Sequence, residues 1–182
     1  MKVQLQNVKL RTKWLRKPFS ASALQNWLVN DTSLTARLQK RYRDFYVKPL
    51  FQRDARPIQD EARMLALRPS TNAYIREVLL IGNQRPVVYA HSVLPHRSLR
   101  GTWYKLGRLG NQPLGAALFK NMQVTRTPLS YKKLSSNHVL YRKAVREIAH
   151  PPAYLWARRS VFRLKCANIL VTEVFLPELC HE

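Results

Sequence analysis

The chain has 182 residues, 46% of them hydrophobic, with no low-complexity run and no internal repeat. This length suits one domain over residues 1–182, long enough to bury roughly 70% of the surface of the unfolded chain. The 32 Lys and Arg residues outnumber the 10 Asp and Glu residues, so the formal net charge is +22. Such a charge predicts an anionic partner: a nucleic acid, an acidic membrane surface or a small anionic substrate.

Several common kinds of site and segment are excluded by what the sequence lacks. Cys166 and Cys180 do not have the His/Cys spacing of a zinc site, and no P-loop, GxGxxG, HExxH or Ser/His/Asp motif occurs. Residues 1–7 have no signal-peptide core, and no apolar run approaches the roughly 18–20 residues of a membrane span. We therefore expect a reduced, cytoplasmic protein that needs no metal or other cofactor.

The first third of the chain predicts a helical hairpin followed by a strand, after a basic N-terminal segment at 1–19. A short helix is expected to start at Ser20 or Ser22, whose hydroxyl can cap it, and to end near residue 30. A second helix over 34–42 follows a run of three capping residues and carries apolar side chains at helical spacing. Residues 44–53 predict the first strand.

The middle of the chain predicts a β-hairpin. Residues 54–72 form a polar connection, in which Glu61 to Leu67 is either helical or extended. Residues 73–82 and 87–94 are rich in β-branched residues, and the segment Asn83-Gln84-Arg85-Pro86 between them is typical of a turn. The two runs therefore predict a pair of antiparallel strands.

The next segment predicts three helices and a strand. Helices are expected over 98–109 and 113–119, the latter starting with a proline, whose missing N–H is not needed at that position. Residues 122–133 predict a third long strand. Residues 137–149 predict a basic helix that His150-Pro151-Pro152 ends.

The C-terminal part predicts a closing hairpin, with strands over 154–165 and 168–176 joined at 166–167. The predicted strands are arranged mainly as hairpins, with helices inserted between them. This order favours an α+β fold with an antiparallel sheet.

Two charged residues interrupt the two most apolar predicted strands. Arg76 lies in the strand over 73–82, and Glu173 lies in the strand over 168–176. Alternation along a strand places each charge on the same face as apolar neighbours. A charge on a core face is costly unless a side chain or a ligand pairs with it, so both residues are candidate ligand-binding groups.

Structural explanations stand beside this one. Each charge could point to water on the exposed face of an antiparallel sheet. Glu77 directly follows Arg76, so one of these two must point each way. Arg76 and Glu173 could also form an ion pair with each other.

Two helix starts and one histidine complete the candidates. The backbone N–H groups near Leu114 and at 32–34 could bind an anion, although an ordinary capped helix would have the same sequence. His91 lies on the strand paired with that of Arg76, where a structural role is the simpler explanation. The set suits a small carboxylate ligand that also carries a hydroxyl, with Arg76 holding the carboxylate and Glu173 accepting from the hydroxyl.

Six fragments occur in an order and spacing that is specific as a set. They are Arg76-Glu77-Val78-Leu79-Leu80, Leu106-Gly107, Gln112 to Phe119, Thr125-Arg126, Trp156 to Ser160 and Leu170 to Pro177. Together they resemble the chorismate pyruvate-lyase family, over about residues 20 to 177. The resemblance implies a carbon–oxygen lyase that eliminates pyruvate from chorismate to form 4-hydroxybenzoate, the first step of ubiquinone biosynthesis. It also implies a cofactor-free monomer with a single antiparallel sheet of about six strands, whose helices and helical flaps cover a buried ligand site.

The resemblance also implies roles for individual residues. Arg76 matches the arginine that binds the ligand carboxylate, Leu114 the residue whose backbone N–H joins it, and Glu173 the acid that meets the 4-hydroxyl. Leu34 falls on a flap, where the family often has Met. His91 falls where some members have a second active-site arginine. We expect it near the departing group as a hydrogen-bond donor or acid. A neutral histidine would hold a second carboxylate less well, unless another of the many basic groups replaces the arginine.

Some features fall outside the resemblance, and other functions remain open. Residues 135–152 are expected to be an insertion that adds basic charge without a catalytic part, and the charge of +22 is not explained. The chain could instead be a non-catalytic domain that senses a small carboxylate, like the effector domains of some GntR-like regulators. It could also be a basic protein that binds nucleic acid or an anionic membrane. For the enzyme, no specific nucleic acid is expected, whereas a peripheral contact with an anionic membrane is compatible.

Overall fold

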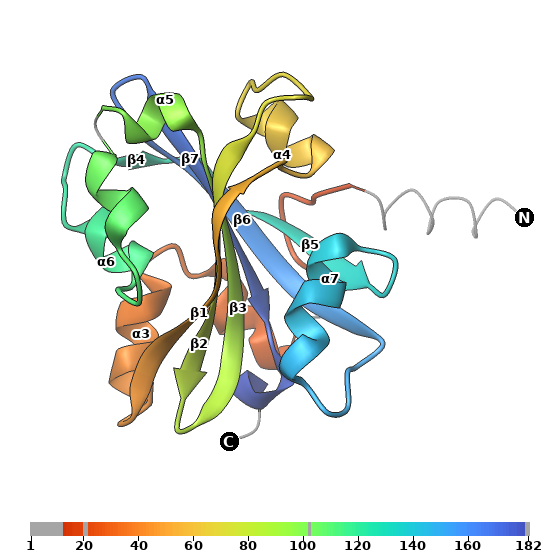
Figure 1. Cartoon of the computed structure of the whole chain (residues 1–182). Helices are drawn as coiled ribbons and strands as arrows, with labels where there is room; N and C mark the ends of the chain where they lie inside the picture. Colours follow the sequence, from red (N-terminus) through yellow and green to blue (C-terminus); the bar gives the residue numbers. More distant parts are fainter. Residues whose placement is uncertain (1–12, 20–21, 102, 181–182) are drawn as a thin grey trace, which may run out of the picture.

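A computed structural model describes residues 13–19, 22–101 and 103–180 (Figure 1). Its sheet has the strand order β1-β2-β3-β7-β6-β4, with β5 also paired to β6, and every pairing is antiparallel. The strands are β1 (Phe45–Ala55), β2 (Ala73–Gly82), β3 (Arg85–Leu94), β4 (Thr125–Arg126), β5 (Ser130–Ser135), β6 (Tyr154–Leu164) and β7 (Ala167–Phe175). The expected α+β class and single antiparallel sheet are confirmed, with seven strands rather than six in the described part of the chain.

Helices cover both faces of this sheet. They are α2 (Gln25–Val29), α3 (Leu34–Arg41), α4 (Gln59–Met64), α5 (His96–Leu99), α6 (Leu114–Phe119) and α7 (Val139–Ala144), with 3-10 turns η1 (Ser22–Leu24), η2 (Tyr104–Arg108), η3 (Val145–Glu147) and η4 (Pro177–Cys180). Figure 1 shows α3, α5 and α6 on one side of the sheet and α4 and α7 on the other. Within the described ranges, no helix is long and apolar enough to cross a membrane.

The expected long strand over 122–133 is wrong, because two short strands, β4 and β5, occupy this segment. Pro128 lies between them and has no N–H to donate to a sheet ladder. Thr127 keeps the segment on β6 instead: its N–H donates to the carbonyl of Val161 at 2.9 Å, and its hydroxyl accepts from the Val161 N–H at 2.9 Å. The interruption accounts for the additional strand.

The first hairpin turns more tightly than expected, and the second turns one residue earlier than expected. Strands β2 and β3 are joined by Asn83 and Gln84, which have φ angles of 48° and 66°, and positive φ at both central residues is typical of a type I′ turn. Strand β3 therefore begins at Arg85, two residues earlier than expected. The hairpin of β6 and β7 turns at Lys165, whose φ is 54°, and β7 begins at Ala167.

Of the expected helices, α3 agrees best. Its N-cap Ser33 accepts from the N–H of Ala36 at 3.3 Å, as the capping pattern predicts. The expected helix over 98–109 is wrong in extent: α5 begins at His96 and ends at Leu99, and η2 follows as a separate turn. The expected cap at Ser20 falls outside the described residues.

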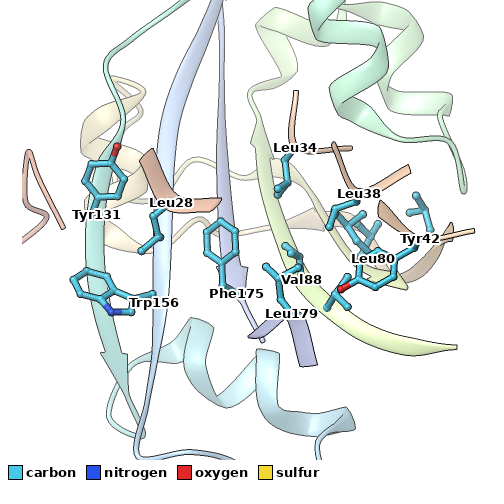
Figure 2. Packing of buried hydrophobic residues seen from close by; sticks show 13 residues of the cluster. Leu28, Leu34, Leu38, Tyr42, Leu80, Val88, Tyr131, Trp156, Phe175 and Leu179 are labelled. Carbon is cyan, nitrogen blue, oxygen red and sulfur yellow. The ribbon is translucent and has the colours of Figure 1, made fainter. Parts of the chain in front are cut away.

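Alternation along the strands gives the sheet two faces, and both are buried by other elements. On one face, here called the pocket face, a cluster joins α2 and α3 to the strands, and Figure 2 shows Leu28, Leu34 and Leu38 packed near Val88 and Phe175. The other face, here called the opposite face, packs against α7 through a second cluster. That cluster includes Leu79, Ile81, Tyr89, Leu140, Tyr141, Ala144 and Val174. Because both faces are covered, Arg76 and Glu77 are both buried, and the alternative in which Arg76 points to water is wrong.

Candidate active site

A cavity lies between the pocket face and the helices α3 and α6. Its lining combines apolar side chains with two arginines and one glutamate. The lining residues are Thr32, Leu34, Thr35, Val47, Arg76, Val78, Leu80, Ala90, Ser92, Pro113, Leu114, Gly115, Leu118, Phe119, Arg126, Phe162, Val171 and Glu173. Four of the five residues expected at the site therefore line one cavity: Leu34, Arg76, Leu114 and Glu173.

Arg76 projects from β2 into this cavity and is 2% exposed. Its Nη2 donates to the carbonyl of Gly110 at 3.1 Å and to that of Gln112 at 2.8 Å, so it holds the loop that precedes α6. Its Nε is buried and has no hydrogen-bond partner among the described residues. Burial lowers the pKa of Arg76 from its ordinary value, but an arginine stays protonated in a protein. Arg76 thus presents a fixed positive charge with a donor that an anionic ligand could satisfy.

Glu173 reaches the same cavity from β7, and strand β3 lies between it and Arg76. Its Oε2 accepts from Nε of Arg158 at 2.5 Å, whereas its Oε1 makes no hydrogen bond within the described part of the chain. Arg76 and Glu173 form no ion pair with each other, so that alternative is wrong. Glu173 can accept from a ligand hydroxyl while Arg158 fixes its orientation.

Arg158 is a residue that the sequence reasoning missed. Its side chain is completely buried, and its Nη1 donates to the carbonyls of Trp27, Leu28 and Asn30 at 2.8, 3.2 and 2.5 Å. These carbonyls lie at the end of α2, so Arg158 ties that helix to Glu173. Arg158 and Phe162 lie on the same strand an even number of positions apart, so alternation directs their side chains to the same face. The large apolar side chain of Phe162 was therefore a signal in the sequence that Arg158 faces inward.

Arg126 is the second arginine of the cavity lining, and no role had been predicted for it. It lies on β4, and its Nε donates to Oγ of Ser160 at 2.7 Å. Its Nη1 donates to the carbonyl of Asp31 at 2.6 Å. Its guanidinium carbon lies 4.9 Å from the ring centre of Phe162 and 5.7 Å from that of Phe119. These contacts hold the guanidinium group against the edge of the cavity.

Helices α3 and α6 form the cover of the cavity, as expected for helical flaps. Leu34 at the start of α3 and Leu114 at the start of α6 are both buried. The N–H of Leu114 donates to no described residue, because the first N–H groups of a helix have no acceptor within it. Gly115 lets the two helices approach closely, since a Cβ there would lie 3.0 Å from Oγ1 of Thr35.

His91 is the expected site residue that the structure does not bring to the cavity. It lies between Ala90 and Ser92, which both line the cavity, so alternation along β3 directs its imidazole to the opposite face. We expected His91 near the departing group of the substrate, and the structure instead places its imidazole away from the cavity. The same alternation that orients Arg76 could have shown this, because β3 pairs His91 directly with Glu77.

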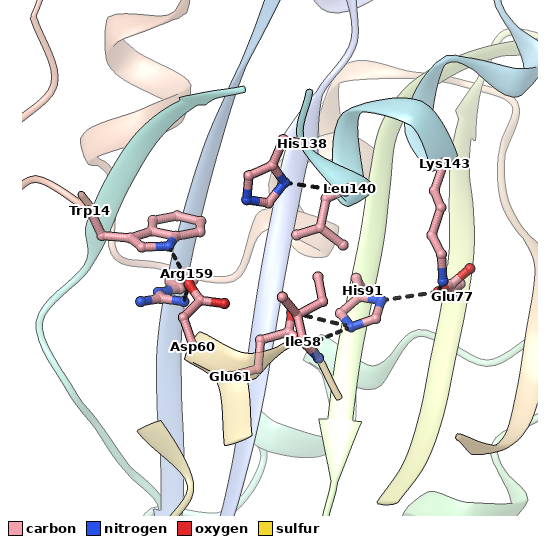
Figure 3. A network of polar contacts seen from close by, with 10 residues as sticks. All are labelled: Trp14, Ile58, Asp60, Glu61, Glu77, His91, His138, Leu140, Lys143 and Arg159. Atoms are coloured by element: carbon pink, nitrogen blue, oxygen red, sulfur yellow. Dashed lines mark hydrogen bonds and ion pairs between the residues drawn. The ribbon is translucent and has the colours of Figure 1, made fainter. Parts of the chain in front are cut away.

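On the opposite face, His91 lies between two carboxylates (Figure 3). Its Nε2 is 3.3 Å from the carboxylate of Glu61, and its Nδ1 is 3.2 Å from Oε1 of Glu77. Burial alone would lower the pKa of His91, but its interactions with Glu61 and Glu77 outweigh burial and raise it to about 9. His91 is therefore a charged structural residue at neutral pH.

The network continues to both sides of His91. Lys143 of α7, within the segment 135–152, forms an ion pair with Glu77. Burial would raise the pKa of Glu77, but hydrogen bonds from His91 and Lys143 outweigh burial and lower it to about 2. Farther along, Asp60 accepts from Nε1 of Trp14 at 2.9 Å and from Nη1 of Arg159 at 2.8 Å (Figure 3). The charged side chains of the opposite face thus pair with one another, although Nε of Arg159 is buried without a hydrogen-bond partner in the described part of the chain.

The described ranges contain no candidate metal site and no disulfide. No group of three or more His, Cys, Asp or Glu residues there is arranged to hold a metal ion. Cys166 and Cys180 are both free and exposed. The cavity is the candidate active site because its lining combines two arginines and one glutamate with apolar side chains.

Comparisons with known proteins identify the family of this chain and agree with its fold. A family model described as chorismate lyase matches residues 8–182. A probable chorismate pyruvate-lyase from Nitrosomonas europaea is 47% identical over 167 residues, covering 91% of this chain and 94% of that protein. Another from Thiobacillus denitrificans is 45% identical over 171 residues, covering 93% and 91%. The effector domain of PhnF from Mycobacterium smegmatis shares the fold, with a TM-score of 0.56 at 13% identity over 81% of this chain and 90% of that domain. The chain belongs to the chorismate lyase family.

Proposed function

We propose that this protein is a chorismate pyruvate-lyase, which converts chorismate to 4-hydroxybenzoate and pyruvate. The observation that carries the proposal is the cavity itself. It places the unpartnered Nε of Arg76 and the free Oε1 of Glu173 on one inner face, in a chain of the chorismate lyase family. From the sequence resemblance we also infer that this reaction is the first step of ubiquinone biosynthesis and that a cofactor-free monomer in the cytoplasm carries it out.

The cavity suits one aromatic acid held at both ends. Arg76 and the N–H of Leu114 would bind the ring carboxylate, and Glu173 would accept from the 4-hydroxyl. Between them, the apolar side chains of Leu34 and Val78 would contact the ring. Four of the predicted site residues thus have distinct tasks, and His91 has none at the ligand.

The reaction needs positioning more than a strong catalytic acid or base. The bond between ring carbon C3 and the ether oxygen breaks, C4 loses its hydrogen as a proton, and the ring becomes aromatic. The departing enolpyruvate takes up a proton at carbon and becomes pyruvate. Aromatisation supplies much of the driving force, so the protein mainly orients the substrate and stabilises developing negative charge. The ion pair with Arg158 keeps Glu173 oriented toward the 4-hydroxyl.

The proposed contacts also predict strong binding of one product. 4-Hydroxybenzoate keeps both the carboxylate that Arg76 would bind and the hydroxyl that Glu173 would accept. It should therefore inhibit the enzyme competitively against chorismate, whereas pyruvate, which lacks this pairing, should inhibit weakly. Steady-state inhibition patterns with each product measure this difference.

The test is product analysis with purified protein. Chorismate is supplied in buffer containing a chelator, and 4-hydroxybenzoate and pyruvate are quantified over time against a reaction without protein. We expect equimolar release of both products. Binding of chorismate without turnover would contradict the lyase and favour a sensing domain. Retention on heparin with neither binding nor turnover would favour the basic binding protein.

A further inference from the structure

We propose that Arg126 binds the second carboxylate of the substrate, the one on the enolpyruvyl ether, and thereby makes the cavity prefer dicarboxylates. This inference rests on the proposed function, because it assigns a subsite within the same cavity. It concerns a residue for which the sequence predicted no role, and it replaces His91 as the partner of that carboxylate.

The charges of the cavity lining support this assignment. Among the lining residues only Arg76 and Arg126 are cationic, and only Glu173 is anionic. Chorismate carries two carboxylates, which the two arginines could pair with one to one, and one hydroxyl, which could donate to Glu173. His91 lies on the opposite face between two carboxylates and cannot reach the cavity.

The contacts of Arg126 prepare it to bind an anion. Its Nε and Nη1 are both engaged, by Ser160 and by the carbonyl of Asp31. Its Nη2 makes no hydrogen bond to a described residue and stays available. Because the other contacts already fix the guanidinium group, a ligand gains a hydrogen bond without ordering a flexible side chain.

The register of the sheet places Arg126 on the correct side. Ser160, which anchors Arg126, lies in the same cross-strand row as Arg76, with Ser92 and Val171 between them. The two arginines therefore approach the cavity from opposite sides, and Glu173 lies in the neighbouring row. In chorismate the ether and the hydroxyl occupy adjacent ring carbons. A ring held by Arg76 and Glu173 can turn its ether group toward the strands that carry Arg126, and we assign that orientation to the bound substrate.

A purely structural role for Arg126 makes a different prediction. Arg126 links β4 to Ser160 and to the segment before α3, so its removal could loosen the cavity. That damage would weaken every ligand to a similar extent. A carboxylate subsite would instead weaken only those ligands that carry the second carboxylate.

Equilibrium binding of two stable ligands separates these roles without requiring turnover. One ligand is 4-hydroxybenzoate, and the other is 3-(carboxymethoxy)-4-hydroxybenzoate, which adds an ether-linked carboxylate beside the hydroxyl. Calorimetry gives the Kd of each ligand. In the unmodified protein we expect the dicarboxylate to bind about 10- to 100-fold more tightly, as one charge-assisted hydrogen bond would allow. In Arg126→Gln this preference should fall to about twofold or less, with the Kd for 4-hydroxybenzoate changed by less than threefold.

Two further variants make the result decisive. Arg163→Gln removes the same charge from an exposed position opposite Thr125 and should keep the full preference. If Arg126→Gln does not fold, Arg126→Lys takes its place. In Arg126→Lys the ratio of the two Kd values should fall at least threefold, because an ammonium group cannot keep both hydrogen bonds of Arg126 and also reach the ligand. An unchanged preference in either folded Arg126 variant, or equal weakening of both ligands, would overturn the inference. Loss of preference in a protein that does not turn over chorismate would support the subsite and contradict the lyase.

Discussion

The two faces of one sheet bury charged residues in different ways. On the opposite face, His91 is surrounded by Glu61 and Glu77, and Lys143 completes the network. On the pocket face, Arg76 has a buried Nε without a partner next to a cavity. A buried charge alone therefore does not mark a binding site. An unsatisfied donor beside a cavity is the stronger indication, because leaving it unpaired is costly until a ligand arrives.

The largest effect is expected at Arg158, which contributes to both stability and the site. Arg158→Met leaves Glu173 without its cation and three carbonyls at the end of α2 without a donor. Breaking such a buried pair should lower the free energy of unfolding by about 3–5 kcal/mol, and lyase activity should fall with it. Urea denaturation measures the first quantity. A variant as stable as the unmodified protein would show that this pair is not a structural support of the pocket face.

The next effect separates the two faces by activity. Arg76→Gln should lower kcat/KM for chorismate by at least about 1,000-fold, or about 4 kcal/mol, because the carboxylate loses its charged partner. The glutamine amide can still donate to Gly110 or Gln112, so the fold should persist by circular dichroism. The matched variant is His91→Gln on the opposite face, which should keep kcat/KM within about threefold. Equal losses in both variants would remove the distinction between the faces.

The charged residues of the opposite face should make the free energy of unfolding depend on pH. The folded pKa of His91, about 9, lies above its unfolded value of about 6.5, so the folded state binds the extra proton between these values. The contribution of His91 to the free energy of unfolding should therefore be fully present below about pH 6.5 and fall by a few kcal/mol as the pH rises through 9. His91→Gln should lose this alkaline slope. A slope of equal size in His91→Gln would assign the effect to another group.

Glu77 should contribute at the other end of the pH range. Its folded pKa, about 2, lies below its ordinary value of 4.5, so its stabilisation is present above pH 4.5 and is lost as the pH falls through 2. Replacing Glu77 with Gln should reduce the acid slope of the unfolding free energy and leave the alkaline slope of His91 smaller, since one carboxylate partner is gone. The free energy of unfolding is measured as a function of pH for Glu77→Gln, for His91→Gln and for the variant that carries both substitutions. Comparison of the three gives the interaction between Glu77 and His91.

The smallest effect is expected at the contact between the two flap helices. A Cβ at Gly115 would lie 3.0 Å from Oγ1 of Thr35, so Gly115→Ala should push α6 slightly away from α3. We expect a 2- to 5-fold weaker Kd for 4-hydroxybenzoate, about 1 kcal/mol or less. Gly107→Ala is the control, because a Cβ there meets nothing closer than 3.8 Å. A stronger effect at Gly107 would contradict a flap contact at Gly115.

The sequence predicted what depends on local pattern. Alternation placed Arg76 and Glu173 on inward faces, and the capping residues before α3 located its start. The family resemblance added Leu34 and Leu114 to the predicted ligand site, and both line the cavity. Pro128 was a visible obstacle to a continuous strand, and its effect on the number of strands was missed.

What could not be predicted depends on pairing between distant segments. Arg158 meets Glu173 only because β6 pairs with β7, and it meets the end of α2 across 128 to 131 positions of sequence. Arg126 enters the cavity because β4 returns to β6 after the flap helices. A single sequence does not contain such pairings, so no role was predicted for Arg126, and His91 was expected near the departing group instead.

A crystal structure with 4-hydroxybenzoate bound tests the central claim most directly. We predict the ligand in the cavity of the pocket face, with its carboxylate within hydrogen-bond distance of Nε of Arg76 and its hydroxyl donating to Glu173. The network around His91 should be unchanged from the unliganded protein. A ligand bound on the opposite face, or one whose carboxylate and hydroxyl contact neither Arg76 nor Glu173, would contradict the account.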